Sequence, residues 1–372
     1  MAGIRFSLAY GLAMCLLYLY LLGADVPTDV QAHAALLTEH LDAGRFPAPP
    51  GYFASLWGVA KLLGGRLLPA SALLLGMVCA LKFRVAYQLV KGWFTGMAAP
   101  HLGWLLWGIC FMAPIPTQLE GYWYVGRFTA LVLQNSTLLF VWPLCLWLFG
   151  LSLQYLQHPG GKLALRIGVA LVLITLCKPS YLLAWAPVFG LMAGGPALYR
   201  RRWAALASTT ALCGLAVVLV WAMQQWMHRA NVGIYAPTPV TWAPLEAWLH
   251  FAPRPWLMVA ASFPALGAAL VLYGQRLWAY LPMRFALATL LVALAWYLLL
   301  AETGERMYSG NFYWQIPLSL FTVYLAATPV LYPLFCGKTT PWQAKLIAGL
   351  AAMQCLGGLA YVVRTCVSGQ YM

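Results

Sequence analysis

The stretch RRRWAALASTTALCGLAVVLVWAMQQW, residues 200–226, decides the fold of this chain. Three arginines are followed by residues 203–226, which carry no charge and are mostly apolar. A helix that crosses a bilayer needs about 20 mostly apolar residues, and Lys and Arg cluster at the cytoplasmic ends of such helices. We therefore expect a membrane-spanning helix over 203–226 that begins on the cytoplasmic side.

Similar apolar runs recur along the whole chain. Hydrophobic residues make up 63% of it and charged residues 8%, whereas a soluble domain has about 25% charged residues. A membrane β-barrel would show short alternating segments instead. The sequence predicts an all-α polytopic membrane protein, a single transmembrane domain over residues 1–372 with about 10–12 helices. The expected spans are 6–23, 51–65, 68–90, 97–114, 129–156, 161–177, 181–197, 203–226, 255–274, 280–301, 312–335 and 342–363.

The formal charge of +14 follows the pattern of a membrane protein with positive residues inside. Basic residues gather in short loops, which argues against a nucleic-acid partner. Residues 24–50, 227–254 and 302–311 are then expected on the extracytoplasmic side. Within 51–114 simple alternation fails, because Lys82, Arg84 and Lys91 suggest a cytoplasmic loop. We expect one of the segments 51–65 or 97–114 to be half-inserted or re-entrant.

The first extracytoplasmic loop contains an amphipathic helix. Thr28 and Gln31 fit a capping box, apolar residues follow at helical spacing, and Gly44 supplies a stop. Such a helix lies on a membrane surface. Glu39 and Asp42 are expected to be solvated charges on its polar face.

Several motifs occur in a fixed order. Asp29-Val-Gln-Ala-His33 is followed by Gly44-Arg45-Phe46-Pro47 and Pro49-Pro50-Gly51-Tyr52. In this order they resemble the membrane-embedded GT-C glycosyltransferases, which use sugars carried on polyprenyl phosphate. Three later motifs resemble features of bacterial members of this family. Gln134-Asn135-Ser136-Thr137 with Trp142-Pro143 resembles a helix start, and Lys178-Pro179-Ser180-Tyr181 resembles a Lys-Pro-Ser turn. Glu302-Thr-Gly-Glu-Arg306 with Gly310-Asn311-Phe312-Tyr313-Trp314 resembles a loop of members that build cell-envelope polysaccharides. The resemblance implies a GT-C-like helix bundle.

Asp29 is the residue that we expect to act as catalytic base. Transfer to a hydroxyl needs a carboxylate within hydrogen-bond reach of the proton, and Asp29 begins the surface helix. Its negative charge could instead stabilise the N-terminus of that helix through the helix dipole. Asp25 is the second candidate for the base, or for steering a metal or a sugar hydroxyl. His33 lies one turn after Asp29, so it could orient the base, bind the donor phosphate, or be a plain interfacial histidine.

Two cations are candidates for the donor phosphate. Lys178 interrupts an apolar run before Pro179, where a charge is costly unless it is paired or faces water. It suits a lipid phosphate, and snorkelling to the interface is the alternative. Arg306 could bind phosphate with two nitrogens, or form a local ion pair with Glu302.

Carboxylates, amides and aromatic rings in the loops are candidates for holding the sugar or the acceptor. Aromatic residues are also typical of any membrane interface, which is the alternative for this group. These candidates are Glu302, Glu120, Asn311, Trp314 and Tyr52. The nine cysteines are scattered singly, so no metal-ligand set is predicted, although a divalent cation is left open as a cofactor.

The sequence and the resemblance together predict an inverting glycosyltransferase in a bacterial inner membrane. It would move a sugar from a polyprenyl-phosphate donor to a glycan or glycolipid acceptor on the extracytoplasmic face, in contact with membrane lipids. A flippase or other transporter of lipid-linked sugars is one alternative, and it would place charges at mid-membrane depth. A polysaccharide polymerase is another.

Overall fold

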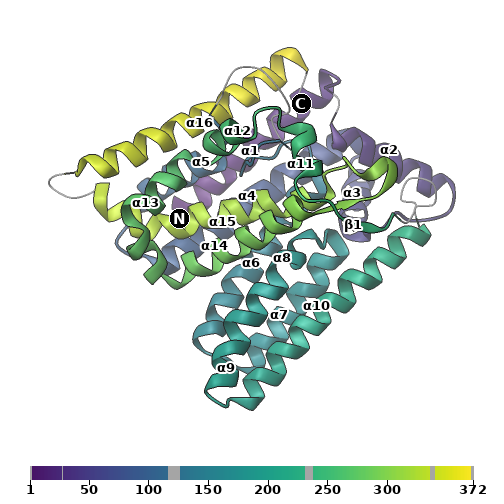
Figure 1. Cartoon of the computed structure of the whole chain (residues 1–372). Coiled ribbons are helices and arrows are strands. Elements are labelled where there is room, and N and C mark those ends of the chain that lie inside the picture. Colours follow the sequence, from purple (N-terminus) through teal and green to yellow (C-terminus); the bar gives the residue numbers. More distant parts are fainter. Residues whose placement is uncertain (1, 27, 116–125, 231–237, 336–339, 370–372) are drawn as a thin grey trace. The chain divides into compact units, whose positions relative to one another are not determined.

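The computed structural model describes residues 2–26, 28–115, 126–230, 238–335 and 340–369 (Figure 1). These residues form an all-α polytopic membrane protein with one small sheet. Among them, eight helices are long and apolar enough to cross a membrane, or nine if a bent pair counts as one span. The chain divides into two compact units, Gly3–Val85 with Leu133–Pro237, and Ala86–Val132 with Thr238–Met372. The single domain expected over 1–372 stays a prediction.

The first unit is helical throughout. α6 is its most buried span, and it packs against α7, which in turn packs against α10 (Figure 1). The exposed residues of α10 are mostly apolar and include Val217, Val218 and Trp221, as expected for a helix that faces lipid. The elements are α1 (Ala2–Gly23), α2 (Asp29–Asp42), α3 (Pro50–Leu62), most of α4 (Leu67–Trp93), α6 (Ser136–Gln157), α7 (Gly161–Cys177), α8 (Ser180–Phe189), the π-helix η1 (Gly190–Gly194), α9 (Gly195–Tyr199) and α10 (Trp203–Ala230).

α1 and α4 cross at very close range where each carries a glycine. A Cβ atom on Gly76 would lie 2.6 Å from the Cβ of Cys15 and 2.9 Å from the carbonyl oxygen of Gly11. A Cβ atom on Gly11 would lie 2.7 Å from the carbonyl oxygen of Gly76. Small residues let membrane helices approach in this way, because backbone then packs on backbone.

Replacing Gly76 with leucine should destabilise the first unit. The added side chain has no space at the crossing, and overpacking of this kind costs about 1–3 kcal/mol. Gly92→Leu is the matched control, because Gly92 lies on the same helix and has no atom within 4 Å of its Cβ position. The melting temperature in detergent should fall for Gly76→Leu only. Equal melting temperatures for the two variants would contradict this account of the crossing.

The helix predicted in the first loop is confirmed. Thr28 caps α2, and both hydrogen bonds of the capping box with Gln31 are present. α2 ends at Asp42, and Gly44 follows with a φ of 65°. α2 packs against α6, and its buried residues include Val30 and Leu37. Glu39 and Asp42 are exposed, as predicted.

The second unit is built around α15. α15 is buried from Ile316 to Pro329, and it packs against α14 and α5, with α13 and α16 alongside each other (Figure 1). The elements are the end of α4, α5 (Ala99–Cys110), β1 (Val240–Trp242), α11 (Glu246–Phe251), α12 (Pro255–Ser262), α13 (Pro264–Ala279), α14 (Leu281–Leu299), β2 (Leu300–Glu302), the 3-10 helices η2 (Gly304–Arg306) and η3 (Asn311–Gln315), α15 (Ile316–Phe335) and α16 (Trp342–Ser368).

Two loops of the second unit are joined by a sheet that the sequence did not predict. β1 pairs antiparallel with β2, with Val240 opposite Glu302 and Trp242 opposite Leu300. The ring of His250 stacks on that of Tyr308 with centroids 3.9 Å apart. Within the second unit, the described parts of the expected loops 227–254 and 302–311 are therefore held together by this strand pair and this ring stack, whereas residues 227–230 belong to α10.

Two expected spans are shorter than predicted. The segment 51–65 forms α3 of 13 residues, and 97–114 forms α5 of 12 residues. At 1.5 Å per residue these helices are about 20 Å long, whereas the hydrocarbon core is about 30 Å thick. α3 stops because Gly64 and Gly65 follow with positive φ angles. Among the described residues, eight or nine of the about 10–12 expected spans reach the length of a membrane span, and α7 with 17 residues is at the lower limit for a span.

Two further spans differ in shape. The expected span 255–274 is bent by 68° between α12 and α13, and Pro264 begins the second helix. Proline lacks the N–H group and clashes with the preceding turn, so it kinks or breaks a helix. The expected span 129–156 begins as a helix only at Ser136, because Asn135 caps α6.

The cytoplasmic loop expected around Lys82, Arg84 and Lys91 is wrong for Lys82 and Arg84, which lie inside the continuous helix α4. Lys91 lies in the last turn of that helix, at its C-terminal end. Lys82 is only 3% exposed, and its Nζ lies 3.6 Å from the centre of the Trp142 ring. A cation over an aromatic face is stabilised by the ring, which explains how this lysine is accommodated inside an apolar helix.

Candidate functional site

The start of α6 and the end of α7 meet at a lysine. Lys178 follows the last residue of α7, and Pro179 prevents that helix from continuing. The Nζ of Lys178 donates hydrogen bonds to Asn135 Oδ1 at 3.1 Å and to Thr137 Oγ1 at 3.0 Å. Asn135 Oδ1 also accepts from the backbone N–H of Leu138 at 2.9 Å, so one side chain caps α6 and holds the ammonium.

Asp29 is the acid whose charge acts on this lysine. It occupies the first turn of α2, where it is partly buried. Burial raises the pKa of the Asp29 carboxyl, and the charge of Lys178 lowers it to a smaller extent. Burial lowers the pKa of Lys178 to about 8, against the opposing charge of Asp29. Lys178 keeps some exposed surface, so this site is accessible from outside the protein.

His33 lies beside the same helix start. Its Nδ1 is 2.6 Å from the hydroxyl oxygen of Ser136, the first residue of α6. The rings of Tyr52 and Phe53 meet its imidazole edge-on, with centroids 5.8 Å and 5.7 Å away. Burial, and secondarily the charge of Lys178, lower the pKa of His33 to about 4. The imidazole is therefore neutral near pH 7, and it offers a hydrogen bond rather than a positive charge.

Tyr52 lies in the interior of the first unit. Its ring is fully buried between those of Phe53 and Phe140. Its hydroxyl faces Ser71 and Ser136 but makes no hydrogen bond of ordinary geometry. A contact of Tyr52 with sugar or acceptor stays a prediction.

A glycine fixes the position of Lys178. A Cβ atom on Gly51 would lie 2.7 Å from the Sγ of Cys177 and 2.8 Å from the carbonyl oxygen of Leu176. The first turn of α3 therefore touches the last turn of α7, immediately before Lys178. In the motif Pro49-Pro50-Gly51-Tyr52, this close approach is the physical reason for the glycine.

Asp25 differs from Asp29 in its surroundings. It is exposed in the turn after α1, and its φ of 52° places it in the left-handed region. That conformation is uncommon for residues other than glycine, although Asp tolerates it better than most. Its role as an alternative base stays a prediction.

The second unit holds the remaining predicted residues that the structure describes. Oε2 of Glu302 accepts hydrogen bonds from Asn311 Nδ2 at 2.6 Å and Ser309 Oγ at 3.0 Å, and Arg306 Nε lies 3.2 Å away. This ion pair is the alternative that we considered for Arg306. Glu302 therefore organises its own loop, whatever else it binds.

The remaining predicted residues are Trp314 and Glu120. The ring of Trp314 is partly buried and lies edge-on to Tyr313 at 5.4 Å. Glu120 lies outside the described residues. Sugar binding by Glu302, Asn311 and Trp314 and phosphate binding by Arg306 stay predictions, because these residues and Asp29 belong to different units.

Sequence reasoning missed two residues of this site. It used Asn135 and Thr137 only as part of a motif, whereas both hold the ammonium of Lys178. The available signal was an Asn-Ser-Thr run, which is typical of a helix N-cap. For metals, no group of three or more His, Cys, Asp or Glu side chains suited to a cation occurs in the part of the chain that the structure describes.

Comparison of the chain with protein-family models, with curated proteins and with solved structures finds no match. The arrangement of Asp29, His33 and Lys178 around the start of α6 is therefore the basis for any statement about function.

Proposed function

We propose that the chain is an inverting glycosyltransferase that uses a polyprenyl-phosphate sugar on the extracytoplasmic face of a bacterial inner membrane. The observation that carries this proposal is that Asp29 and Lys178 lie close enough for the charge of each to shift the pKa of the other, beside the start of α6. A carboxylate with a raised pKa suits the acceptor hydroxyl, whose proton must be removed. A cation held at a helix N-terminus suits the phosphate that leaves.

Asp29 would take the proton of the acceptor hydroxyl. The acceptor oxygen then forms a bond to the anomeric carbon from the face opposite the phosphate. As that bond forms, the bond between the anomeric carbon and the phosphate oxygen breaks, and the electron pair leaves with polyprenyl phosphate. Configuration at the anomeric carbon is inverted, and the proton remains on Asp29 until it passes to water.

Lys178 would stabilise the charge that develops on the departing phosphate. Its ammonium has three N–H donors, and two of them are directed at Asn135 and Thr137. The start of α6 adds the favourable dipole that helix N-termini offer to anions. The neutral imidazole of His33 could donate or accept a hydrogen bond at the reacting groups. Arg306 remains a second candidate for the phosphate.

One observation favours the transporter alternative. Lys82 is buried near the middle of α4, and charges at that depth often mark a transport path. The Trp142 ring offers a structural explanation, and Lys82 requires no substrate to be stabilised there. We therefore retain the transferase as the proposed function.

The proposal can be tested with purified protein in detergent micelles. A panel of short-chain polyprenyl-phosphate sugars would be incubated with bacterial glycolipid acceptors, and release of polyprenyl phosphate would be followed by mass spectrometry. A transferase releases it together with a product one sugar larger. A flippase performs no chemistry in micelles. Translocation in vesicles without release in micelles would overturn the proposal.

The Gly51 contact gives a further prediction. Gly51→Val should push the end of α7 and displace Lys178, and a shift of about 1 Å in a catalytic group can cost up to about a hundredfold in rate. Gly58→Val is the matched control, since Gly58 lies on the same helix with no atom near its Cβ position. Transfer rates should fall for Gly51→Val alone. Equal rates in two folded variants would show that the contact does not position Lys178.

A further inference from the structure

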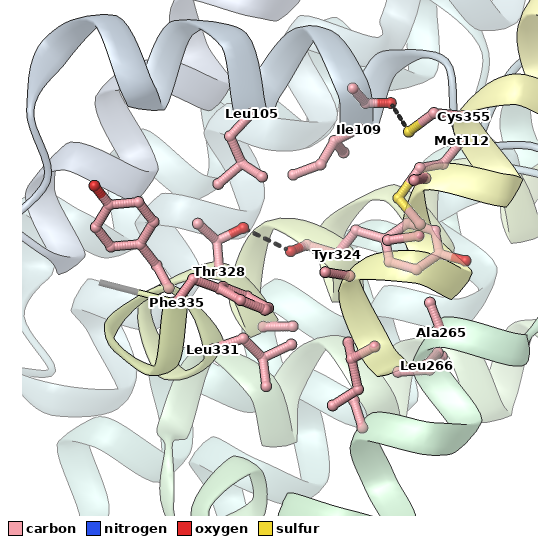
Figure 2. Close-up of a pocket in the computed structure, with 18 of the residues that line it drawn as sticks. Leu105, Ile109, Met112, Ala265, Leu266, Tyr324, Thr328, Leu331, Phe335 and Cys355 are labelled. Carbon is pink, nitrogen blue, oxygen red and sulfur yellow. Dashed lines mark hydrogen bonds between the residues drawn. The ribbon is translucent and has the colours of Figure 1, made fainter. Parts of the chain in front are cut away.

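The second unit contains a cavity that the proposed function does not use. It has a volume of about 370 Å³, within the range of small-molecule sites. α5, α13, α15 and α16 line it. Figure 2 shows Leu105, Ile109 and Met112 on one side, with Thr328 and Leu331 across the space from them. An open apolar space of this size can hold part of a ligand of matching chemistry.

Small side chains create the space. Ala269 of α13, Ala327 of α15 and Ala351 of α16 line the cavity, and Gly108 of α5 lines it as well. A larger side chain at any of these positions would fill the volume that the alanines leave. Protein interiors are otherwise closely packed, so a gap bounded by four helices is not an ordinary packing defect.

The polar groups in the wall are already satisfied. Thr328 Oγ1 donates to the carbonyl oxygen of Tyr324 at 3.0 Å, and Cys355 Sγ donates to that of Gly108 at 3.2 Å (Figure 2). The hydroxyl of Tyr324 accepts from Gln354 Nε2 at 3.2 Å. The surface that remains for a ligand is hydrocarbon, so the ligand part that fits is an apolar chain.

The cavity borders a face that is suited to lipid. Trp104, which lines it, is 66% exposed, and Phe335 is 36% exposed. The neighbouring outer face of α16 exposes Leu346, Met353 and Leu356. An exposed apolar face on a membrane-spanning helix contacts bilayer lipid. The molecules with direct access to the cavity are therefore lipids of the bilayer.

One end of the cavity carries positive charge. Tyr332 lies in the wall, and its hydroxyl is 2.9 Å from Nδ1 of His101. Phe94, which follows α4, lies 6.1 Å from the Tyr332 ring. Lys91 is in the last turn of α4, and Lys345 is in the first turn of α16, next to the lining residue Ile347.

Acidic residues are absent from the sequence around this end. The sequence has no Asp or Glu at residues 43–119, 264–279 or 306–372, which include α5, α13, α15 and α16. Lys91 and Lys345 are both exposed, so their charges are available to a ligand. Cationic residues at a helix end near the cytoplasmic surface attract anionic lipid headgroups.

We infer that this cavity binds one acyl chain of an anionic phospholipid, with the headgroup phosphate beside Lys91, Lys345 and His101. The lipid comes from the leaflet at which the C-terminal end of α15 lies, which the distribution of basic loops indicates is the cytoplasmic one. The site belongs to the second unit and shares no residue with the proposed transfer site, and the inference does not depend on the proposed transfer reaction.

Native mass spectrometry of the full chain in detergent tests this inference. Phosphatidylglycerol and phosphatidylcholine with identical chains would each be titrated in. We expect one tightly retained phosphatidylglycerol, and binding of phosphatidylcholine that is about tenfold weaker. Ala351→Leu and Ala269→Leu should each weaken phosphatidylglycerol binding about tenfold by filling the cavity. Ala360→Leu is the control, because Ala360 is exposed on α16 and does not line the cavity.

A double variant tests the headgroup part independently of core packing. Lys91→Gln with Lys345→Gln changes only exposed side chains, and it should remove the preference for phosphatidylglycerol. Equal binding of both lipids to the unaltered chain would overturn the inference. Unchanged binding of phosphatidylglycerol to Ala351→Leu or Ala269→Leu, in a variant that keeps its melting temperature, would overturn it too. Displacement of phosphatidylglycerol by an uncharged prenol at equal concentration, or filling of the cavity by a second copy of the chain, would overturn it as well.

Discussion

Asp29→Asn should abolish sugar transfer while leaving the protein folded. The amide cannot accept the proton of an acceptor hydroxyl, and loss of a general base lowers the rate by about 10²–10⁴-fold. Asn has nearly the same shape, so the packing of α2 on α6 should be preserved. The rate of polyprenyl phosphate release would be measured together with the melting temperature in detergent.

The control for Asp29 lies on the same helix. Glu39 is exposed on α2, so Glu39→Gln removes one negative charge without touching the site. It should retain full activity. Asp25→Asn separates the two candidate bases, and we expect it to be less damaging, because Asp25 is exposed outside the helix. Full activity of Asp29→Asn would exclude Asp29 as the base. If Asp25→Asn were inactive while Asp29→Asn stayed active, Asp25 would be the base.

Lys178→Met should weaken binding of the lipid-phosphate donor. A hydrogen bond to a charged group contributes about 1.5–3 kcal/mol, which corresponds to about 10–100-fold in affinity. The apparent KM for the donor would be measured at saturating acceptor. Lys162→Met is the control, because Lys162 is an exposed cation at the other end of α7. An unchanged KM in Lys178→Met would contradict the phosphate role.

The pKa of Lys178 gives this prediction a pH dependence. The ammonium has a pKa of about 8 and loses its charge as pH rises through that value, so donor binding should weaken above pH 8. Lys178→Arg should move this loss to higher pH, because arginine stays protonated. His33, with a pKa of about 4, is neutral throughout this range and does not contribute.

The effect of Lys178 on stability has the opposite sign. Its pKa is about 8 in the folded protein and 10.5 ordinarily, so between these values the unfolded chain binds more protons. The contribution of Lys178 to the free energy of unfolding therefore rises with pH over this range. Donor binding should therefore weaken above pH 8 while Lys178 does not lower the melting temperature over the same range. That result would show that the loss of binding comes from deprotonation of Lys178 and not from unfolding. If donor binding of Lys178→Arg still weakened at pH 8, a group other than residue 178 would be responsible for the pH dependence.

The sequence predicted the features that depend on local patterns. Apolar runs identified the helical membrane class, and Thr28 with Gln31 predicted the cap of α2. Length and composition alone did not distinguish a full span from α3 or α5, because glycines and loop contacts determine where those helices stop. Pro264 could have predicted the bend between α12 and α13, since proline disfavours a helix interior.

The site could be predicted only in part. Asp29, His33 and Lys178 were identified by their type and their place beside apolar runs. Their convergence on the start of α6 depends on residues more than 40 positions apart, such as Lys178 and Asn135. The neutral state of His33 follows from burial, which a single sequence does not reveal. The pairing of Val240 with Glu302 is equally long-range and involves strands of three residues, too short to show a pattern.

The central claim is that Asp29 and Lys178 belong to one site for a lipid-phosphate sugar. A cryo-EM map of the Asp29→Asn variant with an intact polyprenyl-phosphate sugar tests it most directly, because that variant should bind the donor without consuming it. We predict donor phosphate density within hydrogen-bond distance of Lys178 Nζ and the sugar next to residue 29. Donor density elsewhere, with Lys178 still bound to Asn135 and Thr137, would contradict the account.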